Sequence, residues 1–206
     1  MIMRVRDVDA ASLQEWHDIL FEKREQNLYN RHTNPLTLTV YHQLIRDLAE
    51  ECETWTEFGI YQGHSLSAAL LTKPKKVRGY DVSLDNYAES SHLFEKFAQE
   101  NDIDFEIITD DTATCPVIDE TDVLHIDSLH TYEHCKKELA RHGNRVRKFI
   151  LFHDTTYAPK VYNAINEFIG RDWKVVTRST VGVGYTLIKR KTRDLKLGPE
   201  KLGKFI

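Results

Sequence analysis

The stretch "TWTEFGIYQGHSLSAALLT", residues 54–72, combines a short strand, a glycine turn and a helix. Its first residues are apolar or β-prone and run directly into Gly59, which predicts a buried strand that ends in a tight turn. The small and apolar residues after Gly63 predict a helix, and Ser65 is placed to cap its first turn. A strand joined in this way to a helix is the opening unit of an α/β fold.

The chain downstream of this unit keeps alternating between strands and helices. After the first strand at 54–60, we expect further strands at 76–82, 104–109, 122–127, 148–154, 173–179 and 183–190. Helices are expected at 65–72, 86–101, 132–143 and 160–170. The short connection between the last two strands predicts an antiparallel pair. The pattern therefore predicts an α/β fold whose seven-stranded, mostly parallel sheet has an antiparallel last strand and helices on both faces.

Two segments flank this α/β region. Residues 1–50 are helix-prone and are interrupted by "HTNP" at 32–35, so we expect an N-terminal helical extension that caps the same domain. The α/β domain itself is expected at 51–190. Residues 191–206 form a basic C-terminal tail, and such charged runs are usually solvated.

Composition excludes several classes of protein. The 206 residues carry a formal net charge of -4, which argues against a nucleic-acid partner. No apolar run approaches the roughly 18 residues of a membrane span, and the first residues lack the apolar core of a signal peptide. The three scattered cysteines are expected to be free thiols in a reducing compartment. We therefore expect a cytoplasmic protein without a nucleic-acid or membrane partner, and a homo-oligomer is left open.

The glycine turn has features of an anion-binding site. Gly59 allows a tight turn, Gly63 allows a ligand to approach the backbone, and the N–H groups that open the next helix can hold an anion. Asp81 ends the second strand 22 positions after Gly59, which suits a carboxylate that binds ribose hydroxyls. The dinucleotide fingerprint G-x-G-x-x-G and the P-loop are both absent. Two glycines after a strand also occur as a purely structural turn.

The segment E-F-G-I-Y-Q-G-H-S, residues 57–65, resembles the first motif of class I S-adenosylmethionine-dependent methyltransferases. It is closest to the G-x-Y-x-G-x-S version of catechol O-methyltransferase-like enzymes. "DSLH" after the fourth strand and "HDT" after the fifth resemble the cephalosporin-hydroxylase-like (methyltransferase 24-type) small methyltransferases. Together the matching segments span roughly residues 53–160. The resemblance implies a Rossmann-like class I methyltransferase fold, with the methyltransferase domain at 51–190.

The resemblance also implies a cofactor site for S-adenosylmethionine. Residues of the first motif would line the methionine end of the cofactor, an acidic residue would hold the ribose, and "TDDT" would lie near the adenine. In that order the implied cofactor-binding residues are Glu57, Gly59, Tyr61, Gly63 and Ser65, then Asp81, then Asp111 and Thr112.

The ends of the fourth and fifth strands carry a candidate metal site and a candidate base. Asp127 and Asp154 end neighbouring strands, so their carboxylates are expected to converge, and oxygen ligands favour Mg²⁺. Catechol-type enzymes complete the site with an Asn, whereas this chain has Thr155; His153 beside the pair would admit a softer ion such as Mn²⁺. His130 occupies the place of the catalytic lysine of catechol-type enzymes, which makes it the candidate general base.

The same residues also have structural interpretations. Asp127 and Ser128 would cap the following helix while His130 makes a loop hydrogen bond. His125 lies within the strand and is more often a core histidine than a ligand. His134 lies on the following helix and is more often an exposed residue.

We therefore expect a methyltransferase that transfers a methyl group from S-adenosylmethionine to oxygen, assisted by a divalent cation, most readily Mg²⁺. The expected acceptor is a small hydroxylated molecule of the sugar or natural-product type. A metal-independent methyltransferase with His130 as base, and a non-catalytic cofactor-binding module, are the alternatives. A non-haem iron oxygenase that uses His125, Asp127 and His153 is disfavoured, because such enzymes have antiparallel sheets.

Overall fold

A computed structural model describes residues 10–30 and 36–191 of the chain. The expected tail at 191–206 lies outside the described residues except for Lys191. Over the described ranges the helices are α1 (Leu13–Asn30), α2 (Leu36–Glu50), α3 (His64–Leu70), α4 (Ser91–Glu100), α5 (Tyr132–His142) and α6 (Pro159–Ile169), with a 3₁₀ turn at Gly143–Arg145. The strands are β1 (Thr54–Phe58), β2 (Lys76–Asp81), β3 (Asp104–Thr109), β4 (Thr121–Ile126), β5 (Val146–His153), β6 (Trp173–Ser179) and β7 (Tyr185–Arg190).

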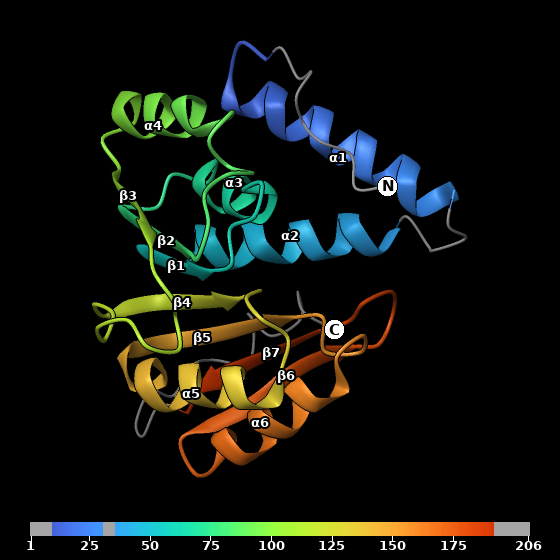
Figure 1. Cartoon of the computed structure of the whole chain (residues 1–206), viewed down its shortest axis with the longest axis vertical. Coiled ribbons are helices and arrows are strands. Elements are labelled where there is room, and N and C mark those ends of the chain that lie inside the picture. The colour runs from blue at the N-terminus through green and yellow to red at the C-terminus, as the bar shows by residue number, and fades with distance from the viewer. Residues whose placement is uncertain (1–9, 31–35, 192–206) are drawn as a thin grey trace.

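These strands form one sheet in the order β3-β2-β1-β4-β5-β7-β6. The first five are parallel, whereas β7 runs antiparallel to both β5 and β6. The chain adds β2 and β3 on one side of β1 and then crosses back, so that β4 lies on the other side of β1. The strands β1 and β4 are therefore neighbours at the centre of the sheet (Figure 1). This arrangement confirms the predicted sheet and its antiparallel last strand.

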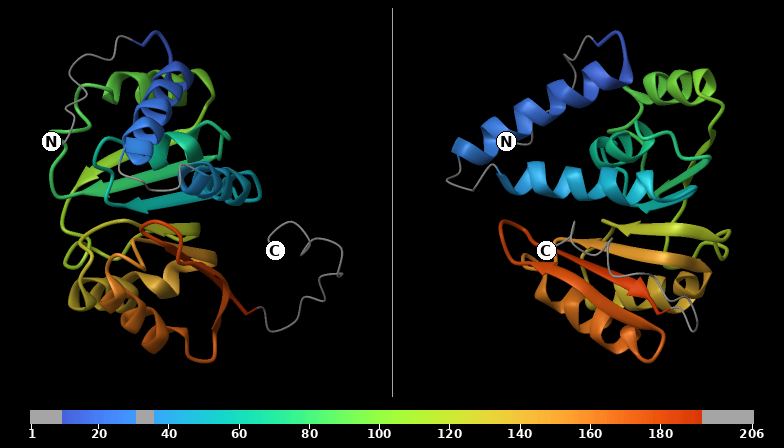
Figure 2. Two further views of the ribbon diagram at one scale, coloured as in Figure 1. Left: turned by 90° about the vertical axis from the view of Figure 1, so that its right-hand side faces the viewer. Right: turned by 180° about the vertical axis from the view of Figure 1, so that it is seen from behind.

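Helices cover both faces of the sheet (Figures 1 and 2). One apolar cluster joins α1, α2, α3 and α4 to the sheet and includes Trp16, Ile45 and Phe94. A second cluster joins α5 and α6 to the opposite face and includes Leu139 and Ile165. Each large, fully buried side chain of this kind contributes about 1.5–3 kcal/mol through removal of apolar surface from water. The N-terminal segment therefore packs on the same core as the central strands.

Two local predictions differ from the structure. The helix expected from residue 86 begins at Ser91, because Tyr87 and Ser90 donate turn hydrogen bonds to Leu84 O and Tyr87 O. The expected cap at Ser65 is also wrong: α3 begins at His64, and Gly63 is its N-cap without a side-chain hydrogen bond. None of the described helices combines the length and apolarity needed to cross a bilayer.

Candidate functional site

The loops that follow β1 and β4 touch at the carboxyl edge of the sheet. Asp127 N–H donates to Phe58 O at 2.8 Å, so the two strand ends stay paired as the chain leaves them. Gly59 has a φ of 83°, and a side chain there would overlap the backbone carbonyl of Asp127. Only glycine combines this conformation with this approach. The glycine turn is therefore held against the loop that carries the candidate metal ligand.

Asp81 fixes the shape of the glycine turn. Its Oδ2 accepts hydrogen bonds from the N–H groups of Ile60 and Tyr61, both at 2.8 Å. Tyr61 adopts a left-handed φ of 51°, which is costly for a residue with a Cβ and is held here by this double contact. A Cβ atom added to Gly63 would lie only 2.7 Å from Cζ of the Phe94 ring. Glycine is therefore required at this position by packing against α4 as well as by its φ of 78°.

Glu57 lies beneath the turn with no exposed surface. Its Oε1 accepts from Ser65 Oγ at 2.6 Å, and its Oε2 accepts from Trp55 Nε1 at 3.1 Å. A buried carboxylate needs such donors, and this need explains why Ser65 turns inward and does not cap its helix. Glu57 therefore anchors the helical end of the glycine turn from below.

A chain of close polar contacts continues from Glu57 toward the edge of the sheet. His125 Nδ1 lies 3.2 Å from Glu57 Oε2, and its Nε2 lies 2.5 Å from the hydroxyl of Tyr41 on α2. The Tyr41 ring packs on His153 with centroids 4.6 Å apart. Burial, together with the charge of Asp127, raises the pKa of Tyr41 well above its ordinary value, so the phenol stays protonated. His125 is thus a bonded core histidine, and it does not join Asp127 and His153 in an iron ligand set.

The acidic cluster, defined as Asp127, His153 and Asp154, lies where β4 and β5 end. One ligand atom from each member lies within 4.8 Å of the other two. His153 Nδ1 is 3.0 Å from Asp127 Oδ1 and 3.4 Å from Asp154 Oδ1. Asp127 is 26% exposed and Asp154 is 16% exposed, so ions and substrates from solvent can reach both carboxylates.

His130 closes the acidic cluster on the outside. Its Nε2 is 3.1 Å from Asp127 Oδ1, and its Nδ1 is 3.4 Å from Asp154 Oδ2. Burial works to lower the pKa of His130, but the hydrogen bond and charge of Asp127 outweigh it and raise that pKa above its ordinary value. Burial likewise opposes ionisation of Asp127, yet the adjacent His153 and His130 hold its pKa well below its usual range. Burial raises the pKa of Asp154.

Backbone strain marks the position of Asp154. Its φ of 57° lies in the left-handed region, which residues with a Cβ adopt at some cost, and such strain often accompanies a functional site. The next residue, Thr155, is fully buried and its Oγ1 accepts from Thr186 Oγ1 at 3.1 Å, so its hydroxyl faces the core and not the acidic cluster. His153, and not Thr155, therefore offers a potential ligand atom beside the two carboxylates.

The loop after β4 is anchored by a residue that sequence reasoning missed. Glu138 on α5 is fully buried, and its Oε1 accepts from Ser128 Oγ at 2.6 Å and from Thr112 Oγ1 at 2.5 Å. The Thr112 side chain therefore faces α5. Asp111 Oδ1 accepts from the N–H of Ala113 at 2.9 Å and shapes its own turn. A buried Glu six residues into a polar helix has no local pattern that distinguishes it from surface glutamates.

The suggested capping role of Asp127 and Ser128 is not observed. Thr131 is the N-cap of α5, and its hydroxyl accepts from the N–H of His134. His134 is largely buried, at 14% side-chain exposure, and its Nε2 lies 3.2 Å from Glu138 Oε1. Asp127 therefore has its carboxylate available for the acidic cluster.

Exposed apolar side chains border the same edge of the sheet. They follow β1, β2, β4 and β5, respectively, and are Tyr61, Val82, Leu129 and Tyr157. Loops at the carboxyl ends of parallel strands are where α/β folds bind ligands, and apolar groups there suit the faces of planar rings.

Several solved structures are similar to this chain. A protein assigned as a caffeoyl-CoA O-methyltransferase from Staphylococcus aureus matches with a TM-score of 0.60 and 14% identity over 87% of this chain and 97% of its own. The fold is the class I methyltransferase fold. An O-methyltransferase from Bacillus cereus in complex with SAH matches with a TM-score of 0.57 and 15% identity, over 91% and 94% of the two chains. The SAH-bound Podospora anserina methyltransferase PaMTH1 has a TM-score of 0.57 and 17% identity, with 89% of each chain covered.

The sequence comparisons give no match. No family model matches the chain. No curated protein matches it either. At 14–17% identity, the structural likeness establishes the fold.

Proposed function

We propose that the chain is an S-adenosylmethionine-dependent methyltransferase that acts on oxygen. The observation that carries this proposal is the contact between Gly59 and the backbone carbonyl of Asp127. It joins a glycine turn suited to the cofactor directly to an acidic cluster suited to acceptor activation. Similar structures from B. cereus and P. anserina are complexes with SAH, which supports the same cofactor here.

The cofactor is proposed to lie over the glycine turn at the carboxyl edge of β1 and β2. Asp81 retains a second carboxyl oxygen, Oδ1, whose protein contact is the N–H of Ser83 at 3.2 Å, and this oxygen is suited to ribose hydroxyls. Exposed Val82 beside it offers an apolar surface for the adenine. Glu57 and Ser65 hold the turn from beneath, so their effect on cofactor binding is exerted through its shape.

The acidic cluster fits a divalent cation. Two carboxylates and one imidazole present ligand atoms within 4.8 Å, and the donors suit Mg²⁺ or Mn²⁺. A bound cation would lower the pKa of an acceptor hydroxyl and orient it. The residues that would hold it are Asp127, Asp154 and His153.

His130 is proposed to take the proton of the acceptor hydroxyl. It lies on the outer side of the acidic cluster, within hydrogen-bond distance of Asp127, and is 28% exposed. General bases work best when their pKa lies near the working pH, which histidine satisfies. Asp127 orients the imidazole through their 3.1 Å contact.

The acceptor is proposed to be a small polyhydroxylated molecule such as a sugar. An open depression of about 750 Å³ adjoins His130, and the α6 residues that line it are polar: Lys160, Asn163, Asn166 and Glu167. Amide and ammonium groups of this kind hydrogen-bond to the hydroxyls of such an acceptor.

A metal-independent methyltransferase is the second candidate. It is favoured by the contacts of His130 with both carboxylates, 3.1 Å to Asp127 and 3.4 Å to Asp154, because two histidines already offset their charge. Here His130 would act as base without a cation, and chelation would leave turnover unchanged.

Calorimetry with SAH tests the cofactor assignment. The wild-type chain is expected to bind SAH at micromolar concentration, and Asp81→Asn is expected to weaken binding by about tenfold or more, the cost of one charge-assisted hydrogen bond. Asp85→Asn, an exposed carboxylate four residues away, is the matched control and should leave binding unchanged. Absence of binding by the folded wild type at millimolar SAH would exclude the proposed function. EDTA in a turnover assay separates the two candidates.

A further inference from the structure

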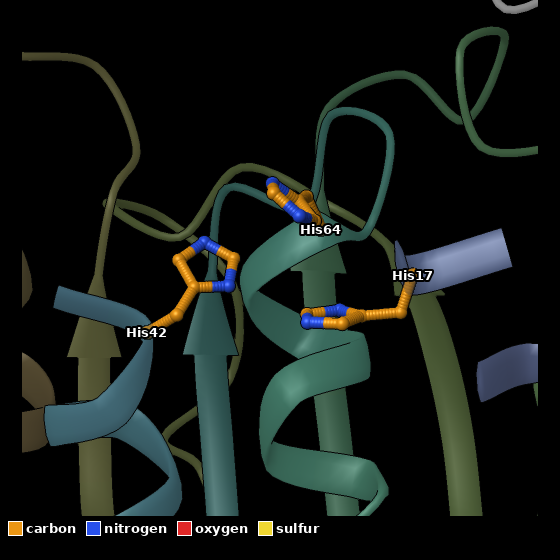
Figure 3. Close-up of side chains that lie close together, drawn as sticks. All are labelled: His17, His42 and His64. Carbon is orange, nitrogen blue, oxygen red and sulfur yellow. The ribbon is translucent and has the colours of Figure 1, made fainter. Parts of the chain in front are cut away.

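A second cluster of potential ligands lies on the N-terminal side of the molecule. His17 on α1, His42 on α2 and His64 at the start of α3 are all buried, and one ring nitrogen of each lies within 4.8 Å of the other two. Figure 3 shows the three rings pointing toward one another from three different helices. We call these three residues the histidine cluster.

We propose that the histidine cluster binds a transition-metal ion of the zinc type, which pins α1 and α2 to the first residue of α3. Imidazole nitrogens are ligands that Zn²⁺, Cu²⁺ and Ni²⁺ accept, whereas Mg²⁺ and Ca²⁺ require oxygen. Three protein ligands also match the zinc sites that keep a fourth position for water.

The hydrogen bonds around His17 prepare one nitrogen for a metal. The Ser67 hydroxyl donates to His64 O at 2.7 Å, so its oxygen accepts from His17 Nδ1–H, also at 2.7 Å. His17 is therefore the Nδ1–H tautomer, and its Nε2 carries the lone pair. Metal-bound histidines are held in this way by an acceptor on the other ring nitrogen.

The distances allow coordination after small rotations of the rings. The ring centroids are 4.1 Å apart for His42 and His64, 5.0 Å for His17 and His64, and 5.4 Å for His17 and His42. Two nitrogens on a tetrahedral zinc ion are about 3.3 Å apart, given Zn–N bonds of about 2.0 Å. One ring nitrogen of each histidine lies within 4.8 Å of the other two, so closing the cluster needs movements of up to about 1.5 Å, within the reach of side-chain rotation.

Burial also favours a metal over protons at His17. Burial, reinforced by Arg46, lowers the pKa of His17 to about 4, so the imidazole is neutral at pH 7. A neutral imidazole is the form that coordinates metals, and its binding then releases no proton from this residue.

The position of the cluster relates it to the glycine turn. His64 directly follows Gly63, and Gly63 N–H and O bond to Ile60 O and Ser67 N–H, both at 2.7 Å. An ion on His64 would therefore fix the end of the glycine turn to α1 and α2. This role is structural and separate from the acidic cluster, whose members lie at the carboxyl ends of β4 and β5.

The experiment measures Zn²⁺ binding in a variant without the acidic cluster. Asp127→Ala/Asp154→Ala protein, dialysed against a chelator, is expected to take up one Zn²⁺ per chain in equilibrium dialysis with elemental analysis. Its Tm should rise by roughly 5–10 °C at a Zn²⁺ concentration about 100 times Kd. Co²⁺ in place of Zn²⁺ should give the visible absorption of a tetrahedral nitrogen site.

Adding His42→Gln to this background variant should weaken Zn²⁺ binding by more than about 100-fold. Loss of a residue that only hydrogen-bonds to a metal ligand weakens metal binding by about 10- to 100-fold, so a larger effect indicates a direct ligand. His92→Gln, an exposed histidine on α4, is the matched control and should bind as the background does. If the folded background variant takes up no Zn²⁺, the proposal is overturned, and the three histidine rings only pack against one another. Uptake that survives His42→Gln also overturns it. If His42→Gln does not fold, stoichiometry and the Co²⁺ spectrum of the background variant still decide.

Discussion

The acidic cluster and the histidine cluster differ in the elements that build them. The acidic cluster lies on loops at the ends of neighbouring parallel strands, is partly exposed and carries charge. The histidine cluster joins three helices through their packing, is buried, and consists of imidazoles alone. Two consecutive residues of α2 contact different clusters: Tyr41 packs on His153 of the acidic cluster, and His42 belongs to the histidine cluster. The carboxylates of the acidic cluster keep access to solvent, whereas the imidazoles of the histidine cluster can lie in the core without a counter-charge.

The largest expected effect comes from the contact that holds the glycine turn against the acidic cluster. Gly59→Ala should lower the free energy of unfolding by about 4 kcal/mol, because a left-handed φ is combined with overlap on the Asp127 carbonyl. Gly170→Ala, where φ is 43° and ψ is -136° but the nearest atom lies 3.6 Å away, should cost about 1–3 kcal/mol. Urea denaturation measures both. Equal losses would show that the contact contributes nothing beyond backbone strain.

Loss of one carboxylate tests whether the acidic cluster acts in catalysis independently of the histidine cluster. Asp127→Asn should reduce kcat about 1000-fold, because a ligand for the cation and the orienting partner of His130 are both weakened. Zn²⁺ binding by the histidine cluster should not change. Asp119→Asn, at the opposite end of β4, is the control and should keep full turnover. A metal-dependent rate that survives Asp127→Asn would remove the acidic cluster from the mechanism.

Removal of the candidate base should have a smaller effect. His130→Gln is expected to lower kcat by about 100-fold while SAH affinity stays at the wild-type value, since general-base catalysis acts on the chemical step. Calorimetry and steady-state kinetics on the same preparation give both quantities. His92→Gln serves as the control. A fall in SAH affinity with unchanged kcat would instead assign His130 to cofactor binding.

The smallest effect tests the α2 residue that contacts the acidic cluster. Tyr41→Phe should cost about 1–2 kcal/mol of stability, because His125 Nε2 would lose its 2.5 Å hydrogen bond inside the core. Tyr87→Phe is a matched control: among the described residues no hydrogen-bond partner reaches its buried hydroxyl. This second change should be neutral or stabilising, as measured by thermal unfolding. Equal effects of the two changes would mean that the hydroxyl of Tyr41 adds no stability.

Much of the acidic cluster could be predicted from sequence because sheet topology has few solutions. Asp127 and Asp154 each end an apolar strand, and the carboxyl ends of adjacent parallel strands lie at one edge. The third member of the acidic cluster could also be named, since His153 is the last residue of its strand. The roles of the predicted cofactor-binding residues remain predictions, although Asp81 and Glu57 are observed to shape the glycine turn.

Short segments of the sequence were enough to predict the order of strands and helices along the chain, the glycine turn and the strand-end carboxylates, because local periodicity and glycine conformation are properties of such segments. Which polar side chains meet in the core depends on tertiary packing and could not be predicted in this way. His17, His42 and His64 are far apart in sequence, as are Tyr41 and His125, which lie 84 residues apart. Their contacts depend on how helices pack on the sheet, where each buried polar group has to find partners among whatever residues the packing brings near.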